Sequence, residues 1–329
     1  MKILVVGGAG YIGSHMAKML SLKGHDVVIF DNLSTGFEKA CQYGQFILGD
    51  LNNISLLESI FDEHRFDAVM HFAGSSLVGE SMVDPSRFYQ NNVGNTLNLL
   101  DAMLQHQVKH FIFSSTAAIF GNPEYTPIDE SHPKQPINPY GKSKLMVEQV
   151  LEDYANAYGL SSVSLRYFNA CGADPNGEIG ECHEPETHLI PIVLQVASGR
   201  RDHITIYGND YTTDDGTCIR DYIHVEDLCT AHDLALQYSL KQTKPQALEF
   251  NLGIGNGFSV KQVINTAKNV TGVDSLKVIE GKRREGDPEV LVADASLALS
   301  TLGWKPAYTD LSTMIQHAWS WELKLSKKL

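Results

Sequence analysis

The sequence begins with a short apolar run that leads directly into closely spaced glycines, and this feature restricts the fold more than any other. The run KILVV spans residues 2–6, and the segment GGAGYIG follows it. A short continuous apolar run is typical of a strand buried on both faces. The next stretch, SHMAKMLSLKGH, has the pattern of a helix that ends at Gly24. We therefore predict a strand, a tight turn and a helix in immediate succession.

The glycines of this turn have the spacing of a dinucleotide-binding motif. Gly7, Gly10 and Gly13 recur every three residues, and such a turn lets a pyrophosphate approach the backbone and the free N–H groups of the helix. Asp31 ends the next predicted strand, 18 residues beyond Gly13, near the spacing at which a carboxylate binds an adenosine ribose. A carboxylate there would repel the 2′-phosphate of NADP, so the pattern predicts NAD. The alternative is a glycine turn that binds no ligand.

Apolar runs continue to alternate with helical sequence through the first half of the chain. The further predicted strands are at 26–31, 66–74, 109–116 and 161–169. Repeated strand–helix units favour a parallel sheet with helices on both faces. We predict an α/β fold, a doubly wound parallel sheet of the Rossmann type with a smaller C-terminal α/β substrate domain. The expected NAD-binding domain is 1–170, which also receives later strands and helices, and the expected, mainly substrate-binding domain is 171–329.

A second motif places a tyrosine and a lysine one helical turn apart. In the segment INPYGKSKLMVEQ, Asn138 and Pro139 suit the start of a helix. Tyr140 and Lys144 then share a helix face. A nearby cation favours the phenolate of a tyrosine, whose ordinary pKa is about 10. A hydroxyl is expected beside them, and Ser114, Ser115 and Thr116 stand at the end of a predicted strand. Alone, the pair is better explained as chance, but beside a dinucleotide turn it predicts an acid/base site.

Composition excludes several classes of function. The chain has 329 residues and a formal net charge of −13, which disfavours nucleic acid and anionic membranes as partners. The five cysteines are scattered without a C-x-x-C pair, so disulfides are not expected. No apolar run approaches the roughly 18 residues of a membrane span, and the first residues lack a signal-peptide pattern. We expect a cytoplasmic protein.

A polar loop near the middle of the chain contains a group of residues that commonly bind metals. The segment ECHEPETH holds Cys182, His183, Glu184, Glu186 and His188. Their spacing matches no standard zinc pattern, and the expected reaction needs no metal. We therefore predict no metal site.

Longer segments resemble the NAD-dependent nucleotide-sugar epimerases of the extended short-chain dehydrogenase/reductase superfamily. They include GGAGYIGSH, NNVGNTLNLL, PYGKSKLMVEQ, LRYFNACGA, DGTCIRDYIHVEDL and RREGDPEVLVAD, in order and over essentially the whole chain. The resemblance implies a tightly held NAD that is not consumed. It implies that Tyr140 takes the proton of a sugar 4-hydroxyl while hydride leaves the sugar carbon, with Lys144 and Thr116 completing the catalytic set.

The resemblance also implies the binding residues. Cofactor contacts would come from the glycine turn and from residues after successive strands, namely Tyr11, Ile12, Asp31, Asn32, Leu33, Ser34, Thr35, Gly36, Asp50, Leu51, Phe72, Ala73, Gly74, Asn91 and Phe168, with Thr116, Tyr140 and Lys144. Substrate contacts would come from Thr116, Tyr140, Asn169, His188, Leu189, Tyr207, Arg220, Arg284, Asp287 and Leu291. Arginine forks suit the phosphates of a UDP-sugar, although without the resemblance a surface ion pair would be the better reading of either arginine.

The sequence departs from the family pattern at several positions. Ser75 and Ser76 stand where relatives often carry a lysine, Phe120 replaces a tyrosine, and His188 replaces an asparagine. Leu291 stands where relatives vary between a bulky tyrosine and a small residue, so acceptance of an N-acetyl sugar stays open.

The resemblance implies interconversion of UDP-galactose and UDP-glucose through a 4-keto sugar, in a homodimer packed through two helices per subunit. The alternative is 4-epimerisation of UDP-N-acetylglucosamine, UDP-xylose or UDP-glucuronate. Dehydration is disfavoured because Ala117 and Ala118 stand where dehydratases carry an acid pair. A non-catalytic NAD(H) sensor usually loses the tyrosine or the lysine, and both are present here.

Overall fold

The apolar runs of the sequence form one parallel sheet. The structure is a computed structural model that describes residues 1–284 and 287–326. Seven strands pair in the order β10-β6-β5-β4-β1-β2-β3, all parallel. Their bounds are β1 (Lys2–Val6), β2 (Asp26–Asp31), β3 (Gln45–Leu48), β4 (Ala68–His71), β5 (His110–Thr116), β6 (Ser161–Tyr167) and β10 (Ala247–Leu252). The predicted doubly wound α/β fold is confirmed.

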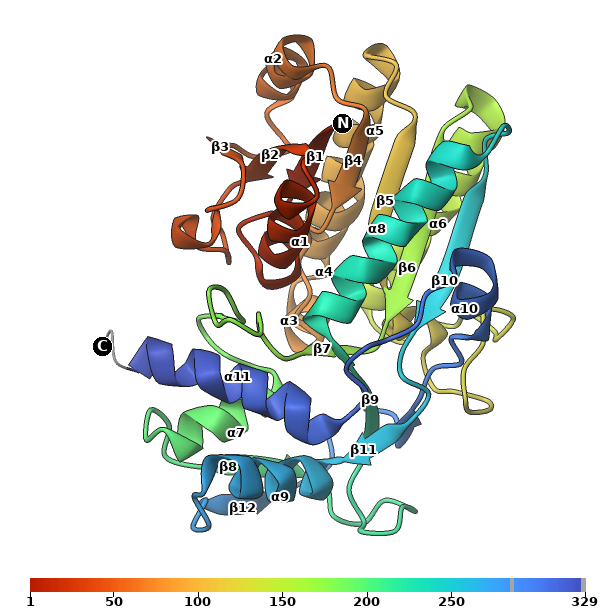
Figure 1. Cartoon of the computed structure of the whole chain (residues 1–329). Coiled ribbons are helices and arrows are strands. Elements are labelled where there is room, and N and C mark those ends of the chain that lie inside the picture. The colour runs from red at the N-terminus through yellow and green to blue at the C-terminus, as the bar shows by residue number, and fades with distance from the viewer. Residues whose placement is uncertain (285–286, 327–329) are drawn as a thin grey trace.

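Alternation along β1 explains why both faces of the sheet carry a core. Ile3 and Val5 point into one apolar cluster, and Leu4 and Val6 point into another, because successive strand side chains face opposite ways. The first cluster is completed by α1 (Tyr11–Leu22), α8 (Val225–Lys241) and α10 (Ser296–Leu302). The second is completed by α2 (Ile54–His64), α5 (Asn95–Gln105) and α6 (Pro139–Tyr158), as Figure 1 shows.

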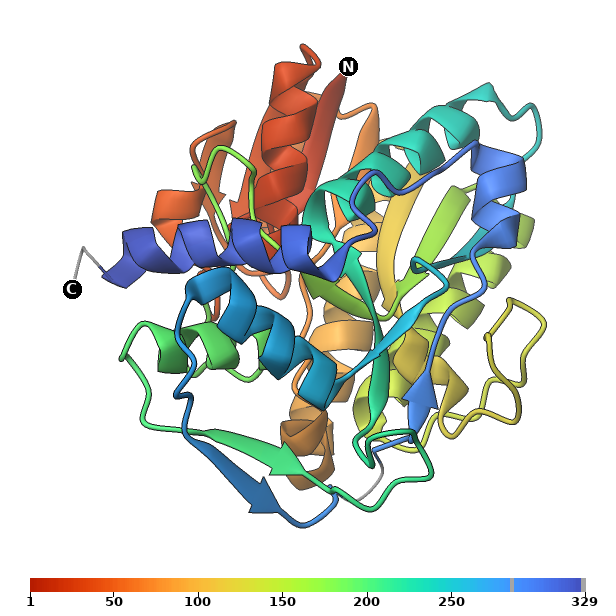
Figure 2. The ribbon, with the colours of Figure 1, turned by 60° about the horizontal axis from the view of Figure 1, so that its bottom comes forward.

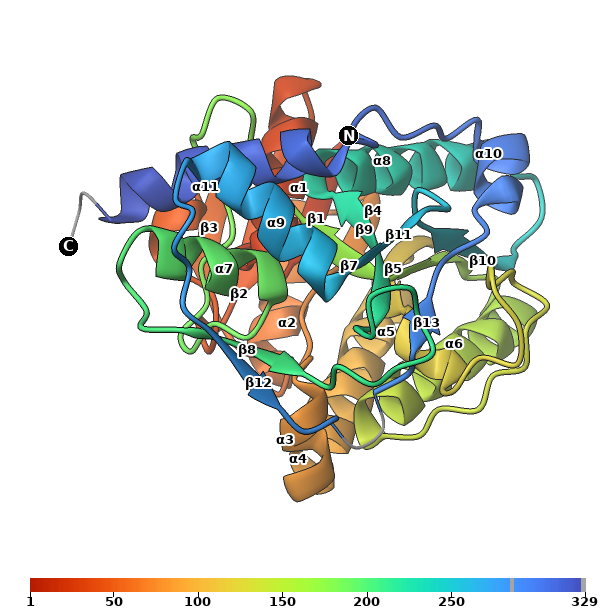
Figure 3. The ribbon, with the colours of Figure 1, turned by 90° about the horizontal axis from the view of Figure 1, so that it is seen from below.

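The later part of the chain packs around a third apolar cluster of its own. Figures 2 and 3 show α7 (Leu189–Ala197), α9 (Val260–Thr271) and α11 (Leu311–Ser326) side by side there. Short strands accompany these helices. They are β7 (Asn169–Cys171), β8 (Ile204–Tyr207), β9 (Ile219–His224), β11 (Gly257–Ser259), β12 (Val278–Gly281) and β13 (Val290–Leu291). One small sheet has the order β11-β9-β13 with β7 also on β9, and the other pairs β12 with β8.

The strand predicted at 161–169 is in fact divided between two sheets. β6 ends at Tyr167, and Asn169–Cys171 forms β7, which pairs with β9. The chain therefore leaves the large sheet and enters the small sheet within two residues. Two short helices that the sequence pattern did not predict, α3 (Val78–Val83) and α4 (Pro85–Tyr89), lie between β4 and α5.

The order of the strands creates a place for a ligand-binding crevice at the carboxyl edge of the sheet. The chain proceeds from β1 outward to β3 and then returns to β4 on the other side of β1. Ligands of open α/β sheets bind outside the carboxyl ends of the strands at such a reversal. The small sheets and α7 lie beyond this edge, below the large sheet in Figure 1.

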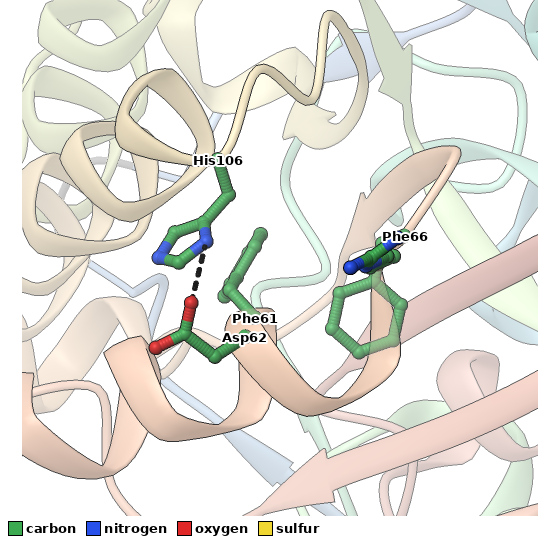
Figure 4. Close-up of a pocket in the computed structure, with 5 residues that line it drawn as sticks. Phe61, Asp62, Phe66 and His106 are labelled. Carbon is green, nitrogen blue, oxygen red and sulfur yellow. Dashed lines mark ion pairs between the residues drawn. The ribbon is translucent and has the colours of Figure 1, made fainter.

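A pocket of about 290 Å³ lies at the opposite, amino edge of the sheet. Phe61, Asp62, Arg65, Phe66 and His106 line it, and Figure 4 shows His106 facing Asp62, with 3.5 Å between Nδ1 and Oδ1. It holds none of the predicted site residues. Across the described part of the chain, every helix is too short or too polar to cross a membrane.

Candidate active site

The glycine turn between β1 and α1 is shaped by close backbone approaches. Gly7 has a φ of +80°, and a Cβ there would lie 2.4 Å from the amide nitrogen of Ala73. A Cβ on Gly13 would lie 2.2 Å from the carbonyl oxygen of Gly7. Both positions therefore require glycine. A Cβ on Gly10 would meet only the Gly7 oxygen, at 3.3 Å, so this glycine leaves open space over the amino end of α1. That cradle fits a pyrophosphate.

Asp31 organises the neighbouring turn at the end of β2. Its carboxylate accepts hydrogen bonds from the backbone N–H groups of Ala9, at 2.9 Å, and Leu33, at 2.8 Å. Burial raises the pKa of Asp31, and these hydrogen bonds oppose the rise. Asn32 donates to Asp50 at 2.7 Å, so two predicted cofactor residues from consecutive turns are in contact. The position of the Asp31 carboxylate suits hydrogen bonds with the two hydroxyls of a ribose.

The segment after β4 meets the catalytic helix. A Cβ on Gly74 would lie 3.3 Å from Lys144 Nζ and 3.3 Å from Asn92 Oδ1. The amide of Asn91 donates to the Ser75 hydroxyl at 3.1 Å. The serine that replaces a family lysine therefore contacts a predicted cofactor residue, while Ser76 is exposed.

The catalytic helix begins as its sequence predicts. The side chain of Asn138 caps α6 by accepting from the Gly141 N–H at 2.8 Å, with Pro139 in the first turn. Tyr140 is half-buried. Burial raises the pKa of Tyr140, and hydrogen bonding with Thr116 opposes the rise. The structure thus brings together the tyrosine and the strand-end hydroxyl, which are far apart in sequence.

The contacts of Lys144 differ from the expectation that its cation lies beside the phenol of Tyr140. Its Nζ donates to the Ser114 carbonyl at 2.9 Å and lies 4.7 Å from the ring centre of Phe113. Burial lowers the pKa of Lys144 to about 8, with Glu148 opposing. Burial is the main cause that acts on the Tyr140 pKa, and it acts upward. The expected lowering by Lys144 is therefore not seen in this arrangement.

A buried ion pair behind the catalytic residues was not singled out from the sequence. Glu148, one turn beyond Lys144, accepts from Arg166 Nε at 2.9 Å and Nη2 at 2.7 Å. It also accepts from the Ser115 hydroxyl at 2.6 Å. This network joins α6 to β5 and β6 directly behind Thr116. The only sequence signal was a glutamate and an arginine inside two of the family-like segments, and neither segment shows that they pair.

The predicted substrate residues gather on the small sheets. Arg220 lies on β9, where it forms an ion pair with Asp287 and donates to the Pro288 carbonyl at 2.6 Å. The guanidinium of Arg284 lies 3.9 Å from the ring centre of Tyr207. Arg220 and Arg284 therefore lie on two segments that neighbour each other. Glu285 and Gly286 of the family-like segment RREGD lie outside the described residues.

Leu291 links the two halves of the site. It is the register partner of Arg220 in the β13–β9 pair. Its side chain packs against the apolar cluster that includes Ala117, Ile119 and Phe120, as does Phe168. Leu291 therefore lies between the arginine-bearing sheet and the segment that follows Thr116.

The loop before α7 folds into a compact charged cluster. Glu181, His183, Glu186 and His188 each offer a ligand atom, and these atoms lie within 4.8 Å of one another. Burial lowers the pKa of His183, but the neighbouring carboxylates of Glu181 and Glu186 outweigh it and raise this pKa to about 10. The spacing argument that predicted no metal site did not anticipate this convergence.

Comparisons with known proteins agree with this geometry. A family model described as the NAD dependent epimerase/dehydratase family matches residues 3–253. A UDP-glucose 4-epimerase of Halalkalibacterium halodurans is 52% identical over 98% of this chain and 95% of that protein. The crystal structure of a Brucella ovis UDP-glucose 4-epimerase in complex with NAD is 49% identical, with a TM-score of 0.93 and 97% of each chain covered. A Campylobacter jejuni UDP-Glc/GlcNAc 4-epimerase structure is 44% identical, with a TM-score of 0.84 over 98% of this chain and 99% of that one.

Proposed function

Because the chain belongs to the NAD dependent epimerase/dehydratase family, we propose that it is an isomerase that interconverts UDP-galactose and UDP-glucose through a 4-keto sugar. The observation that carries the proposal is the meeting of Thr116 and Tyr140 at the carboxyl edge of the sheet, with Lys144 one turn further along. The high identity to UDP-glucose 4-epimerases over almost the whole chain supports it.

NAD is the cofactor, and the carboxyl edge of the sheet fits it. The open position over Gly10 would receive the pyrophosphate, and Asp31 would bind the adenosine ribose. Gly74 leaves room beside Lys144 Nζ, whose remaining donors suit the second ribose. When bound, NAD supplies a nicotinamide that accepts a hydride from the sugar and returns it.

The acid/base work falls to Tyr140. Its phenolate accepts the proton of the sugar 4-hydroxyl, and the resulting phenol later returns the proton to the oxygen of the 4-keto sugar. The Thr116 hydroxyl hydrogen-bonds the sugar 4-oxygen and orients it. Because burial raises the pKa of Tyr140, a favourable charge near the phenol is needed during turnover. Lys144, on the same helix face, is the cation that would supply it once cofactor and substrate are bound, although in the present arrangement it donates to the Ser114 carbonyl and does not lower the Tyr140 pKa.

The other end of the substrate meets the small sheets. Arg220 and Arg284 bind the two phosphates, since a UDP-sugar is a dianion and guanidinium forks suit phosphate oxygens. Asp287 holds Arg220 in place by their ion pair. His188 and Leu189, at the start of α7, border the uridine. Anchoring this end leaves the sugar free to present either face to the catalytic residues.

The chain acts as a homodimer in the cytoplasm. In the dimer that the family resemblance implies, α6 is one of the interface helices. The exposed side chains of Met146 and Tyr158 on α6 support this role. All five cysteines are free, which suits a reducing compartment. Light scattering should give twice the 36.3 kDa mass of one chain; a single-chain mass at micromolar concentration would contradict the dimer.

The proposed reaction has a direct test. Purified protein is incubated with UDP-galactose, and the mixture is separated by anion-exchange chromatography. We expect UDP-glucose to appear until equilibrium is reached, without added cofactor. Protein that holds NAD but converts no UDP-galactose would overturn the proposal. A parallel panel with UDP-N-acetylglucosamine, UDP-xylose and UDP-glucuronate decides whether another UDP-sugar is preferred.

A further inference from the structure

The cluster in the loop before α7 consists of four side chains that can bind a metal through nitrogen or oxygen. Glu181, His183, Glu186 and His188 come from eight consecutive residues, so a single loop supplies the whole cluster. The side chains of Glu181 and Glu186 are only 5% and 3% exposed. Charged carboxylates are rarely buried to this extent without a partner.

The distances within the cluster match those expected around a tetrahedral ion. Zinc binds nitrogen and oxygen at about 2.0–2.2 Å, which makes the edges of a tetrahedron about 3.3–3.6 Å. His183 Nδ1 lies 3.3 Å from Glu181 Oε1 and 3.6 Å from Glu186 Oε2. His188 Nδ1 lies 3.6 Å from Glu186 Oε1 and 2.5 Å from Glu181 Oε1. Three of these four distances are near the tetrahedral length, with the two to Glu186 ending on different oxygens, and the fourth has the length of a hydrogen bond. All four ligand atoms lie within 4.8 Å of one another, so the cluster would contract slightly around an ion.

Two further observations indicate a missing ligand. The buried Nδ1 of His183 makes no hydrogen bond, although two carboxylates are within 3.6 Å. Within residues 1–284 and 287–326, the ion pairs of Glu181 and Glu186 are with His183 and His188 alone. Two buried carboxylates need positive charge nearby, and here His183 and His188 are their ion-pair partners. A divalent cation at the centre of the cluster would take over this role and displace the protons of the two imidazoles.

We propose that Glu181, His183, Glu186 and His188 bind one divalent transition-metal ion, with zinc as the preferred ion. A site with two imidazoles and two carboxylates suits a first-row divalent metal, whereas magnesium and calcium prefer six or more oxygens. Because all four positions are filled by protein, the site is structural rather than catalytic. It goes beyond the proposed epimerase activity and does not depend on it.

The position of the cluster shows what the ion would hold together. Tyr11, in the glycine turn, lies against His183 with 6.5 Å between ring centres, and its hydroxyl donates to the Gly172 carbonyl at 2.7 Å. Trp321 of α11 donates to the Glu181 carbonyl at 2.8 Å. His188 is the residue that precedes α7. The ion would therefore fix the loop between the cofactor turn and the start of α7, and bound His188 keeps its Nε2 for the substrate.

Metal binding by the full-length protein tests this site. Protein is stripped with a chelator, exchanged into chelator-free buffer and titrated with Co²⁺ and with Zn²⁺ in competition with a chromophoric indicator. We expect one equivalent of Zn²⁺ per chain, and a Co²⁺ complex with the strong visible absorption of tetrahedral coordination. Binding below one tenth of an equivalent, or a weak octahedral Co²⁺ spectrum, would overturn the proposal.

Matched variants assign the ligands. His183→Asn and Glu186→Gln should each weaken Zn²⁺ binding by at least the ten- to hundredfold typical of disturbing a metal site. Glu184→Gln changes an exposed carboxylate of the same loop that is not in the cluster, and Cys182→Ser removes the adjacent thiol. Both should bind zinc as wild type does. Equal zinc affinity in wild type and His183→Asn would overturn the assignment. Circular dichroism of each stripped variant shows that it is folded before titration.

Discussion

Tyr140 is the single side chain on which the proposed chemistry depends most. Tyr140→Phe removes the hydroxyl and keeps the ring, so we expect turnover of UDP-galactose to fall by about a hundredfold or more, the usual contribution of general acid–base catalysis. Bound NAD, measured after heat denaturation, should be unchanged. The control is Tyr167→Phe, since Tyr167 is a second half-buried tyrosine, hydrogen-bonded to Ser114; it should lose less than about tenfold. Full turnover in Tyr140→Phe would exclude this residue as the base.

Leu291 is the residue at which sugar preference should be decided. It packs against the apolar cluster of the segment after Thr116, so we expect its side chain to limit the space beside the sugar. We expect Leu291→Ala to raise kcat/KM for UDP-N-acetylglucosamine relative to UDP-galactose by roughly tenfold, because a few methyl groups are worth that much in a pocket.

Val290→Ala is the matched control for this experiment. Val290 is the neighbouring residue of β13 and pairs with Ile219, and its side chain points to the opposite face of the strand. It should leave the ratio of the two kcat/KM values unchanged. A ratio that moves equally in both variants would mean that Leu291 does not border the sugar.

At the scale of elements, the contact of α6 with the sheet depends on a buried ion pair. Glu148→Gln leaves the fully buried guanidinium of Arg166 without its close, two-pronged partner and with the partly exposed Glu249 at 3.7 Å. We expect the free energy of unfolding to fall by roughly 3–5 kcal/mol, as for other broken buried pairs, measured by urea denaturation. Glu80→Gln is the control, because the Glu80–Arg87 pair is about half exposed and should change stability by less than about 1 kcal/mol. Equal losses of stability in the two variants would show that burial does not make the Glu148–Arg166 pair more important than an exposed pair.

The elements differ in how well the sequence predicts them. α6 was predicted from its own residues, since a capping asparagine, a proline and a long helical pattern are local signals. β7 and β13 have three and two residues, too few for a periodic pattern. They exist because β9 lies beside them, and that pairing joins segments far apart in the chain. The domain boundary at residue 170 stays a prediction. Later segments such as β10 belong to the large sheet, so the chain does not divide cleanly at one residue.

At the scale of the whole molecule, buried histidines should make the fold sensitive to acid. Burial lowers the pKa of four of them, His15 and His232 to about 4, and His71 and His224 to about 3. In the unfolded chain they have a pKa of about 6.5. Between about pH 4 and 6.5 the unfolded chain therefore binds more protons than the folded chain. The free energy of unfolding should fall as the pH falls through this window, by up to about 1.4 kcal/mol per pH unit for each histidine.

A single substitution tests that reasoning. His71→Gln removes one of the four groups and keeps a polar atom near the position of Nε2, which now lies 3.0 Å from the Thr96 hydroxyl. Urea unfolding of both proteins at pH 5, 6 and 7 should give the variant the shallower loss of stability towards acid. Parallel pH profiles would show that His71 does not contribute.

The chain by itself determined the strand–glycine–helix turn, Asp31, the capped helix with Tyr140 and Lys144, and the order of family-like segments. These are local patterns, in which the residues that define a feature are adjacent or one helical turn apart. Only the tertiary structure decided that Glu148 pairs with Arg166, that Leu291 lies between Arg220 and Phe168, and that Lys144 is bound to the Ser114 carbonyl. It also decided that four side chains of one polar loop converge. Such contacts depend on the path of the backbone and on burial, which spacing along the chain does not specify.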